Sequence, residues 1–384
     1  MSQHDWNADE AQPVYTRIVP PDPLTGMTLA DRYKVGRFVD EGRTGRIYVG
    51  QDTQEKRRVA LKILHPVLCN VEEQVRRFQR EFEVTSQISH PNCVKMHEFG
   101  AFQGHRYLVM EYLDGRGLDQ TLGNGEMMKP RKAARIAQQI AEALTAAHEH
   151  NVIHRDLNPS NIMLCKVGRQ RDVVKVLDFG LARLQGSTEE LTGVGERLGT
   201  AHYMAPEYIQ STRLDHRSDL YGLGCVLFEM LTGRTPFVGP TLRVLESQVT
   251  HKVPTPTSLA PGTPKWLDAL VMQLLEKSPD ARPENANHVV QALSLGLKEL
   301  EVDLERERAK APVQPKYARQ PIIPAGMGSS ATGPLDLPGR RSEWVTEPAF
   351  VPVPKRPSWL WLLVILIIAF LLSTVFGTLL TQWT

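Results

Sequence analysis

The fold of this chain is decided by the stretch His154-Arg155-Asp156-Leu157-Asn158-Pro159-Ser160-Asn161. Asp156 and Asn161 lie five positions apart in it, and Pro159 between them argues against a regular helix. A carboxylate in such a loop can orient an attacking hydroxyl group and accept its proton. An amide oxygen nearby is a neutral ligand that suits Mg²⁺. Considered alone, a polar loop of this kind is more often a turn than a site.

Two further polar motifs follow this loop along the chain. The first, Leu177-Asp178-Phe179-Gly180, ends an apolar run at residues 173–177 that is typical of a strand. Asp178 suits a second ligand of Mg²⁺, and the glycine after Phe179 permits a mobile loop. The second motif is Ala205-Pro206-Glu207. Taken singly, each of these motifs is also more often a turn than a site.

Two candidates for phosphate binding precede the loop. Residues 40–47 read Asp-Glu-Gly-Arg-Thr-Gly-Arg-Ile, and the glycines Gly42 and Gly45 would let backbone N–H groups approach phosphate oxygens. A hairpin turn with two glycines is nevertheless common. Lys62 ends the apolar run Val59-Ala60-Leu61-Lys62, and Glu81 on the following helical segment could hold its ammonium group. The alternative is a lysine at a strand end that faces water.

Short β-rich segments dominate the first third of the periodic sequence, and helical periodicity dominates the rest. The predicted strands are Tyr33–Val39, Arg46–Gln51, Arg58–Leu64, Val94–Phe102 and Tyr107–Tyr112. The predicted helices are Val71–Ile88, Ala133–His150, Ser218–Thr232 and Trp266–Leu275. A strand-rich part before a helix-rich part predicts an α+β fold of two lobes, with a cleft near residues 111–117.

In content, order and spacing, these motifs together resemble the eukaryotic-like (Hanks-type) protein kinase family. The resemblance covers residues 33–300 and implies a bilobal fold, with a small strand-rich N-lobe at 33–110 and a larger helical C-lobe at 114–300. Residues 199–207 look like the Ser/Thr branch of the family. The sequence of residues 107–112 is most similar to that of bacterial transmembrane Ser/Thr kinases.

The resemblance implies a role for each matching residue in an ATP-dependent, non-specific protein serine/threonine kinase that uses Mg²⁺, with Mn²⁺ as an alternative. The residues of the catalytic group are Asp156 as the base, Lys62 and Asn158. The metal ligands are Asn161 and Asp178. The residues around the nucleotide are Gly42, Gly45, Ile47, Ala60, Lys62, Glu81, Met110, Glu111 and Leu113, with residues 111–113 as the hinge. The structural residues are Asp219, which steadies the catalytic loop, and the ion pair of Glu207 and Arg282.

Three residues depart from the family pattern. Asp40 stands where the first loop glycine is expected, and with Glu41 it brings negative charge near a polyphosphate. Asn158 replaces a lysine, so a cation that would stabilise the transferring phosphate is lost. Thr85 replaces an apolar residue and is expected to loosen the active alignment. We favour a slowed but active protein kinase; the alternatives are a pseudokinase that acts as a membrane-anchored nucleotide-binding scaffold and, less favoured, a metabolite kinase.

The segment after Gly180 carries candidate sites of autophosphorylation. The preferred position is Thr192, and the others are Thr188 and Ser187. A phosphate would bring about −1.5 to −2 charges, which Arg155 could bind. Self-association for phosphorylation between copies is an accompanying expectation. Protein substrates are the expected partners, and the net charge of +2 gives no reason to expect nucleic acid.

The ends of the chain differ from its middle. Residues 1–32 read as a flexible arm, and residues 301–357 as a linker that is first charged and then rich in proline. Residues 359–380 contain no charged side chain and are long enough to span a bilayer as one helix. Lys355 and Arg356 precede that run, so the expected location is the cell membrane, with a cytoplasmic kinase domain and a C-terminus just across the bilayer.

Overall fold

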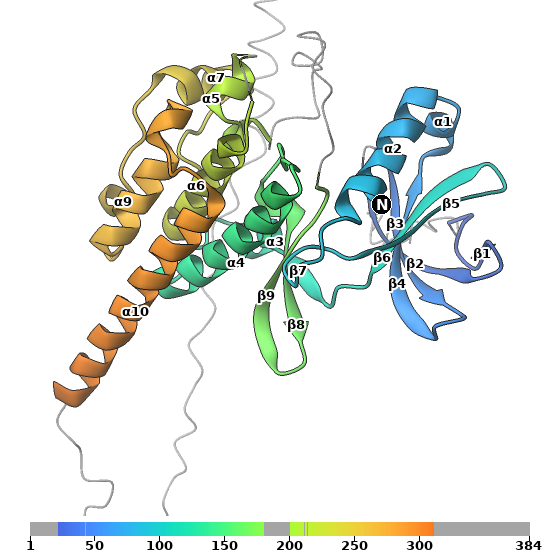
Figure 1. Ribbon diagram of the computed structural model, residues 1–384, viewed down its shortest axis with the longest axis horizontal. Coiled ribbons are helices and arrows are strands. Elements are labelled where there is room, and N and C mark those ends of the chain that lie inside the picture. The colour runs from blue at the N-terminus through green and yellow to red at the C-terminus, as the bar shows by residue number, and fades with distance from the viewer. Residues whose placement is uncertain (1–21, 43, 180–199, 211, 213, 311–384) are drawn as a thin grey trace, which may run out of the picture. The chain divides into compact units, whose positions relative to one another are not determined.

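The computed structural model describes residues 22–310 except residues 43, 180–199, 211 and 213 (Figure 1). The strands are β1 (Thr28–Leu29), β2 (Tyr33–Glu41), β3 (Gly45–Asp52), β4 (Arg57–Leu64), β5 (Met96–Phe102), β6 (His105–Glu111), β7 (Gly115–Gly117), β8 (Ile162–Val167) and β9 (Gln170–Val176). The α-helices are α1 (Pro66–Cys69), α2 (Glu72–Thr85), α3 (Leu118–Leu122), α4 (Pro130–Glu149), α5 (Pro206–Ile209), α6 (Arg217–Thr232), α7 (Thr241–Thr250), α8 (Pro256–Leu259), α9 (Lys265–Leu274) and α10 (Ala286–Lys310). Short 3₁₀ helices are η1 (Pro159–Asn161), η3 (Thr200–Tyr203) and η4 (Pro279–Ala281).

The N-terminal lobe is a six-stranded antiparallel sheet in the order β1-β2-β3-β4-β6-β5, accompanied by α1 and α2. One cluster of buried side chains includes Tyr33, Tyr48 and Val109. A second cluster joins α2 to the sheet and includes Phe78 and Leu108. Because neighbouring side chains of a strand point to opposite faces, each strand can serve both clusters.

The C-terminal lobe is helical and has one large buried cluster of side chains. Helix α6 is buried almost all round, with Leu220, Leu223 and Leu227 fully enclosed, which is typical of a central core helix. Helix α4 packs beside it through small residues such as Ala137 and Ala141. A separate sheet, β7-β8-β9, positions the two loops that carry the polar motifs.

The predicted strands and helices are found within a few residues of their expected bounds, but the N-terminal boundary needs correction. Residues 22–32 were expected to belong to a flexible arm. Instead β1 pairs with β2, and Leu24 and Leu29 are buried in the first cluster of the lobe. The Tyr48 hydroxyl also donates to the Asp22 carboxylate at 2.9 Å. The contact between Asp22 and Tyr48 spans 26 positions, so local composition gave no sign of it.

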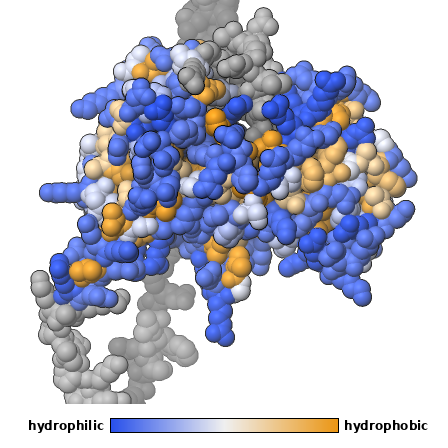
Figure 2. All heavy atoms as spheres, viewed as in Figure 1, coloured by the Kyte–Doolittle hydropathy of each residue, from blue (hydrophilic) through white to orange (hydrophobic). Residues whose placement is uncertain are grey.

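The C-terminal helix extends into the predicted linker, since α10 continues to Lys310. The rest of the linker and the predicted membrane helix at residues 359–380 lie outside the described residues. Among the described residues, no helix has the length and apolar character needed to cross a membrane. On the face of the molecule shown in Figure 2, apolar residues are scattered among hydrophilic ones.

Candidate active site

Three charged side chains meet beside α2 and the end of β9. Lys62 of β4 donates through Nζ to Glu81 Oε1 of α2 at 2.7 Å, and Nζ lies 3.4 Å from Asp178 Oδ1. The side chains of Lys62 and Glu81 are buried, whereas that of Asp178 is 27% exposed. The lysine is therefore shared between one enclosed carboxylate and one that faces more open space.

Burial and the neighbouring opposite charges shift the pKa values of Lys62 and Glu81 in opposite directions. Burial alone would lower the pKa of Lys62, but Asp178 and Glu81 outweigh it and raise that pKa, so the ammonium stays charged. Burial raises the pKa of Glu81 to about 7 although Lys62 opposes the shift. Glu81 Oε2 has no hydrogen-bond partner within the described part of the chain. The pair is thus formed, but its carboxylate is incompletely satisfied.

The loop that carries Asp156 is held by its own amide side chains. Asn158 Nδ2 donates to the Asp156 carbonyl at 3.0 Å and to its carboxylate at 3.2 Å. The Asn158 oxygen accepts from the backbone N–H of Ser160 at 3.0 Å and so caps η1. Asn161 Nδ2 donates to the Asp156 carbonyl at 2.8 Å. The predicted base and the predicted metal ligand are therefore adjacent.

A buried carboxylate fixes the backbone that leads into this loop. Asp219 of α6 accepts from the backbone N–H groups of His154 and Arg155, both at 2.8 Å, and from the His148 ring at 2.9 Å. Arg155 has φ +66°, a left-handed conformation that a non-glycine residue adopts at some cost. Although burial opposes it, these donors lower the pKa of Asp219. The sequence indicated Asp219 but gave no sign of His148 as its partner.

Thr85 occupies a fully buried position at the end of α2. Its hydroxyl donates to the backbone carbonyl of Phe179 at 3.2 Å. The Phe179 ring packs edge-on against the His154 ring, with centroids 5.0 Å apart. Thr85 was expected to loosen this alignment because it is polar. The structure instead gives its hydroxyl a partner that joins α2 to the segment after β9.

The glycines between β2 and β3 have different structural requirements. A side chain at Gly45 would place its Cβ 2.2 Å from the Ile63 carbonyl oxygen, so β3 could not approach β4 as it does. At Gly42 the nearest atom would be 3.8 Å from such a Cβ. Ile47 lies opposite Lys62 in the β3–β4 register. Gly45 is thus required by strand packing, whatever its role toward phosphate.

The predicted hinge lies at the end of β6, beside the predicted wall of the nucleotide pocket. Ala60 of β4 is paired with Met110 of β6, and Leu113 packs on the same buried cluster. The Glu111 carboxylate accepts from the Lys175 ammonium of β9 at 2.6 Å and from the Lys95 backbone N–H at 2.8 Å. The Glu111 side chain therefore ties the hinge to β9. The sequence analysis did not find Lys175, because this contact spans 64 positions.

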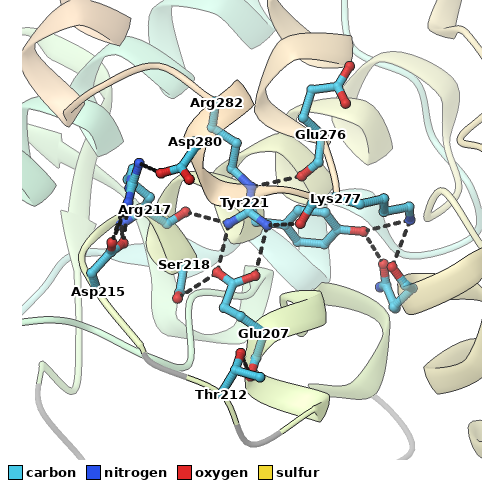
Figure 3. A network of polar contacts seen from close by, with 11 residues as sticks. Glu207, Thr212, Asp215, Arg217, Ser218, Tyr221, Glu276, Lys277, Asp280 and Arg282 are labelled. Carbon is cyan, nitrogen blue, oxygen red and sulfur yellow. Dashed lines mark hydrogen bonds and ion pairs between the residues drawn. The ribbon is translucent and has the colours of Figure 1, made fainter.

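A second buried ion pair lies in the helical lobe (Figure 3). Arg282 donates two hydrogen bonds to the Glu207 carboxylate, at 2.7 and 2.8 Å. The Ser218 hydroxyl also donates to that carboxylate, at 2.7 Å. The remaining guanidinium contacts are to the backbone carbonyl oxygens of Arg217, Glu276 and Lys277. The pair and its surroundings are satisfied on every side.

Comparison with known proteins identifies this arrangement. Residues 33–293 match the protein kinase domain family. The chain belongs to the protein kinase family. It is 34% identical to the serine/threonine-protein kinase pkn3 of Myxococcus xanthus over 351 residues, which cover 88% of this chain and 63% of that protein. It is 36% identical to the pkn2 kinase of the same organism, covering 72% of this chain and 33% of the relative.

A solved structure agrees with this assignment. The kinase domain of PknI from Mycobacterium tuberculosis superposes with a TM-score of 0.54 at 28% identity, covering 70% of this chain and 98% of that domain. The bilobal kinase fold predicted from the sequence is therefore confirmed. This chain spans less than two thirds of the length of the two Myxococcus kinases.

The predicted metal ligands of the kinase domain are suitably placed for a hard divalent ion. The Leu177 backbone N–H donates to the Asn161 carbonyl at 2.9 Å. This bond brings Asp178, the next residue in the chain, close to Asn161. The Asn161 side-chain nitrogen is engaged with Asp156, which leaves the amide oxygen as the ligand atom. One carboxylate oxygen and one amide oxygen fit Mg²⁺ and also Mn²⁺. Within the described ranges, no group of three or more His, Cys, Asp or Glu residues forms another metal site.

The predicted phosphorylation sites lie outside the described residues. Ser187, Thr188 and Thr192 all fall in the range 180–199. Their expected partner Arg155 is described, and its side chain is exposed. The prediction that this arginine binds a phosphorylated residue stays a prediction.

Proposed function

We propose that this chain is an ATP-dependent protein serine/threonine kinase that transfers the γ-phosphate of Mg·ATP to protein hydroxyl groups. The observation that carries the proposal is the convergence of Lys62, Glu81 and Asp178 beside the loop of Asp156 and Asn161. Five residues from four separate places in the sequence meet there. Phosphoryl transfer depends on positioning and on stabilisation of charge, and these residues supply both.

Each residue has a distinct task in the proposed reaction. Bound Mg·ATP supplies the transferable phosphoryl group. Lys62 donates to phosphate oxygens, and Glu81 keeps its ammonium group in place. Asp156 accepts the proton of the attacking hydroxyl, and the amide nitrogens of Asn158 and Asn161 hold it in position. Asn161 and Asp178 would hold the metal.

The proposal is tested by transfer of the γ-phosphate from labelled ATP to a purified test protein. The full-length wild type should transfer phosphate, and Asp156→Ala should be slower by about 10²–10⁴-fold, the usual contribution of a general base. Asp172→Ala is the matched control, because Asp172 is 43% exposed and pairs with Lys132 on the surface. Equal rates in Asp156→Ala and the wild type would contradict the mechanism. Nucleotide binding without transfer in the wild type would favour the pseudokinase.

Autophosphorylation and self-association are part of the same proposal. Mass spectrometry of the wild type and of Asp156→Ala should show phosphate at Thr192, or at Ser187 or Thr188, in the wild type alone. The names of the two Myxococcus relatives support a serine/threonine kinase but say nothing of these positions. Complete absence of phosphate between residues 187 and 200 would reject this part.

We also propose that residues 359–380 anchor the kinase to the membrane with its catalytic domain in the cytoplasm. The support is the uncharged run itself and the two basic residues, Lys355 and Arg356, that precede it. Full-length protein should resist alkaline extraction from the membrane fraction. Ile367→Lys with Leu371→Lys should release it, since each charge costs about 2.5–3.5 kcal/mol near the centre of a bilayer. Soluble wild-type protein would reject the anchor.

A further inference from the structure

The loop between β2 and β3 has an electrostatic problem if it is to cover phosphates. Asp40 and Glu41 directly precede Gly42, and two carboxylates beside a polyphosphate repel it. Yet the loop keeps the fold of a hairpin, because the Gly42 N–H donates to the Gly45 carbonyl at 2.9 Å. The contacts around the loop show how the repulsion is reduced.

Both carboxylates have partners on the protein. Asp40 Oδ1 accepts from the Glu41 backbone N–H at 2.8 Å, which turns that carboxylate back to its own chain. Glu41 Oε1 accepts from Arg46 Nε at 3.0 Å. Arg46 also contacts the Asp22 carboxylate at 3.2 Å, so the guanidinium is fixed from two sides. The negative charge of Glu41 is therefore countered by a positioned cation.

His65, which directly follows β4, provides a second set of contacts that hold the loop. Its Nε2 lies 2.8 Å from the Gly42 carbonyl oxygen, and its Nδ1 lies 3.7 Å from Glu41 Oε1. Its backbone N–H donates to the Thr44 carbonyl at 3.0 Å. Because a carbonyl oxygen can only accept, Nε2 must carry a proton. His65 thus contacts Glu41, Gly42 and Thr44.

The same histidine is itself rigidly held. Its carbonyl oxygen accepts from the N–H groups of Leu68 and Cys69, so it forms the N-terminal end of α1. It lies three positions after Lys62 and directly follows the strand that carries that lysine. The ring is largely covered, with 19% of the side chain exposed. The short backbone segment from Lys62 to His65 therefore positions both the loop and the phosphate-binding lysine.

We propose that His65 is a positioning residue that holds the Gly42 carbonyl, while Arg46 neutralises Glu41, so that the loop presents its backbone to the phosphates of a nucleotide. This inference deepens the proposed function and rests on it. A preorganised loop loses less conformational freedom when the ligand binds. Asp40 and Glu41 can then be present without abolishing nucleotide affinity.

The test measures ADP affinity of the full-length protein by calorimetry, and separately the KM for ATP and kcat. His65→Leu should weaken ADP binding and raise the KM by about five- to tenfold, the equivalent of one lost hydrogen bond, with little change in kcat. His65→Gln can still donate to the Gly42 carbonyl and should stay within about twofold of the wild type. His251→Leu, an exposed histidine bonded to Thr250, is the control.

A double-mutant cycle tests the charge separately and does not require His65→Leu to fold. Arg46→Gln should weaken ADP binding about threefold or more, and adding Glu41→Gln should restore it, as expected of coupled neighbours. Unchanged ADP affinity in both His65→Leu and Arg46→Gln would overturn the inference, as would equal losses in His65→Leu and His65→Gln. A wild type that binds ADP without transferring phosphate rejects only the kinase reaction. A wild type that binds no ADP rejects both.

Discussion

Two buried ion pairs in this protein are built in opposite ways. Glu207 and Arg282 are joined by two hydrogen bonds, and every remaining donor of the arginine reaches a carbonyl oxygen (Figure 3). Lys62 and Glu81 are joined by one bond, the lysine is shared with Asp178, and Glu81 Oε2 has no partner among the described residues. The first pair is complete, and the second leaves capacity for a ligand.

The pKa values of the two carboxyl groups express this difference. Burial raises the pKa of both groups, but at Glu207 the bonds from Arg282 and Ser218 outweigh it and the pKa is lowered. At Glu81 burial prevails, and the pKa is raised to about 7. Glu207 is therefore ionised at neutral pH, whereas burial shifts Glu81 toward its protonated form. Perturbed pKa values of this kind are more common at functional sites than in structural ion pairs.

The largest expected effect is on stability, from Arg282→Met. This change leaves a buried, ionised carboxylate without its partner and should lower the free energy of unfolding by about 3–5 kcal/mol. Urea unfolding of the full-length protein measures it. The control is Arg217→Met, because Arg217 pairs with the more exposed Asp215 and Asp280 and should contribute only about 1 kcal/mol or less. Equal losses in the two variants would remove the contrast between the pairs.

The next effect is on catalysis, from Lys62→Met. Transfer should slow by about 10²–10³-fold, because a donor to the reacting phosphates is lost. Stability should fall less than in Arg282→Met, because burial already raises the pKa of Glu81 and its carboxyl group can take up a proton when Lys62 is removed. Steady-state rates and urea unfolding together test this, and a loss of stability as large as that of Arg282→Met would contradict it.

The pair of Glu207 and Arg282 should also make stability depend on pH. Glu207 and Asp219 have lowered pKa values, so their contribution is complete above their ordinary values of 4.5 and 3.8 and is lost as the pH falls through the lowered values. In Arg282→Met, burial is opposed mainly by the bond from Ser218 and should raise the pKa of Glu207. The stability gap between this variant and the wild type should therefore widen as the pH rises from about 4.5 to 7. Unfolding curves at several pH values measure it, and a gap independent of pH would argue against the assignment.

Much of this architecture could be predicted from the sequence. The period of the apolar residues gave the main strands and helices, because each buries one face against a core. The order of the motifs gave Lys62 with Glu81, and Glu207 with Arg282, through the resemblance to the kinase family. The distances of 19 and 75 positions within these pairs could not have been bridged by local pattern alone.

The parts that could not be predicted are contacts between ordinary-looking residues. Lys175 with Glu111, His148 with Asp219, and Asp22 with Arg46 carry no local signature, since a surface position would read the same in the sequence. Gln248 is a further case: it is fully buried, accepts from the Tyr221 hydroxyl, and donates to the His202 carbonyl at 2.7 Å. Such polar residues are identified only when the fold encloses them.

The smallest expected effect concerns Asn158, where the sequence departs from the family lysine. Asn158→Lys restores a cation near the phosphates but loses the oxygen that caps η1, so stability should fall by about 1 kcal/mol. A lysine can still donate to Asp156, and its charge acts mainly on the transition state, so kcat should be at least that of the wild type while ADP affinity changes little.

Asn158→Ala is the matched control for this last change. It loses the same cap and also both hydrogen bonds to Asp156, so its stability should be no higher than that of Asn158→Lys, and its kcat should fall below the wild type by about tenfold. Both variants lack the cap on η1. The difference between their kcat values therefore measures what the hydrogen-bond donor at position 158 and its charge contribute. If Asn158→Lys is as slow as Asn158→Ala, the bonds that Ser160 donates to the Asn158 oxygen are what the reaction requires, and the loop has been rebuilt around the amide.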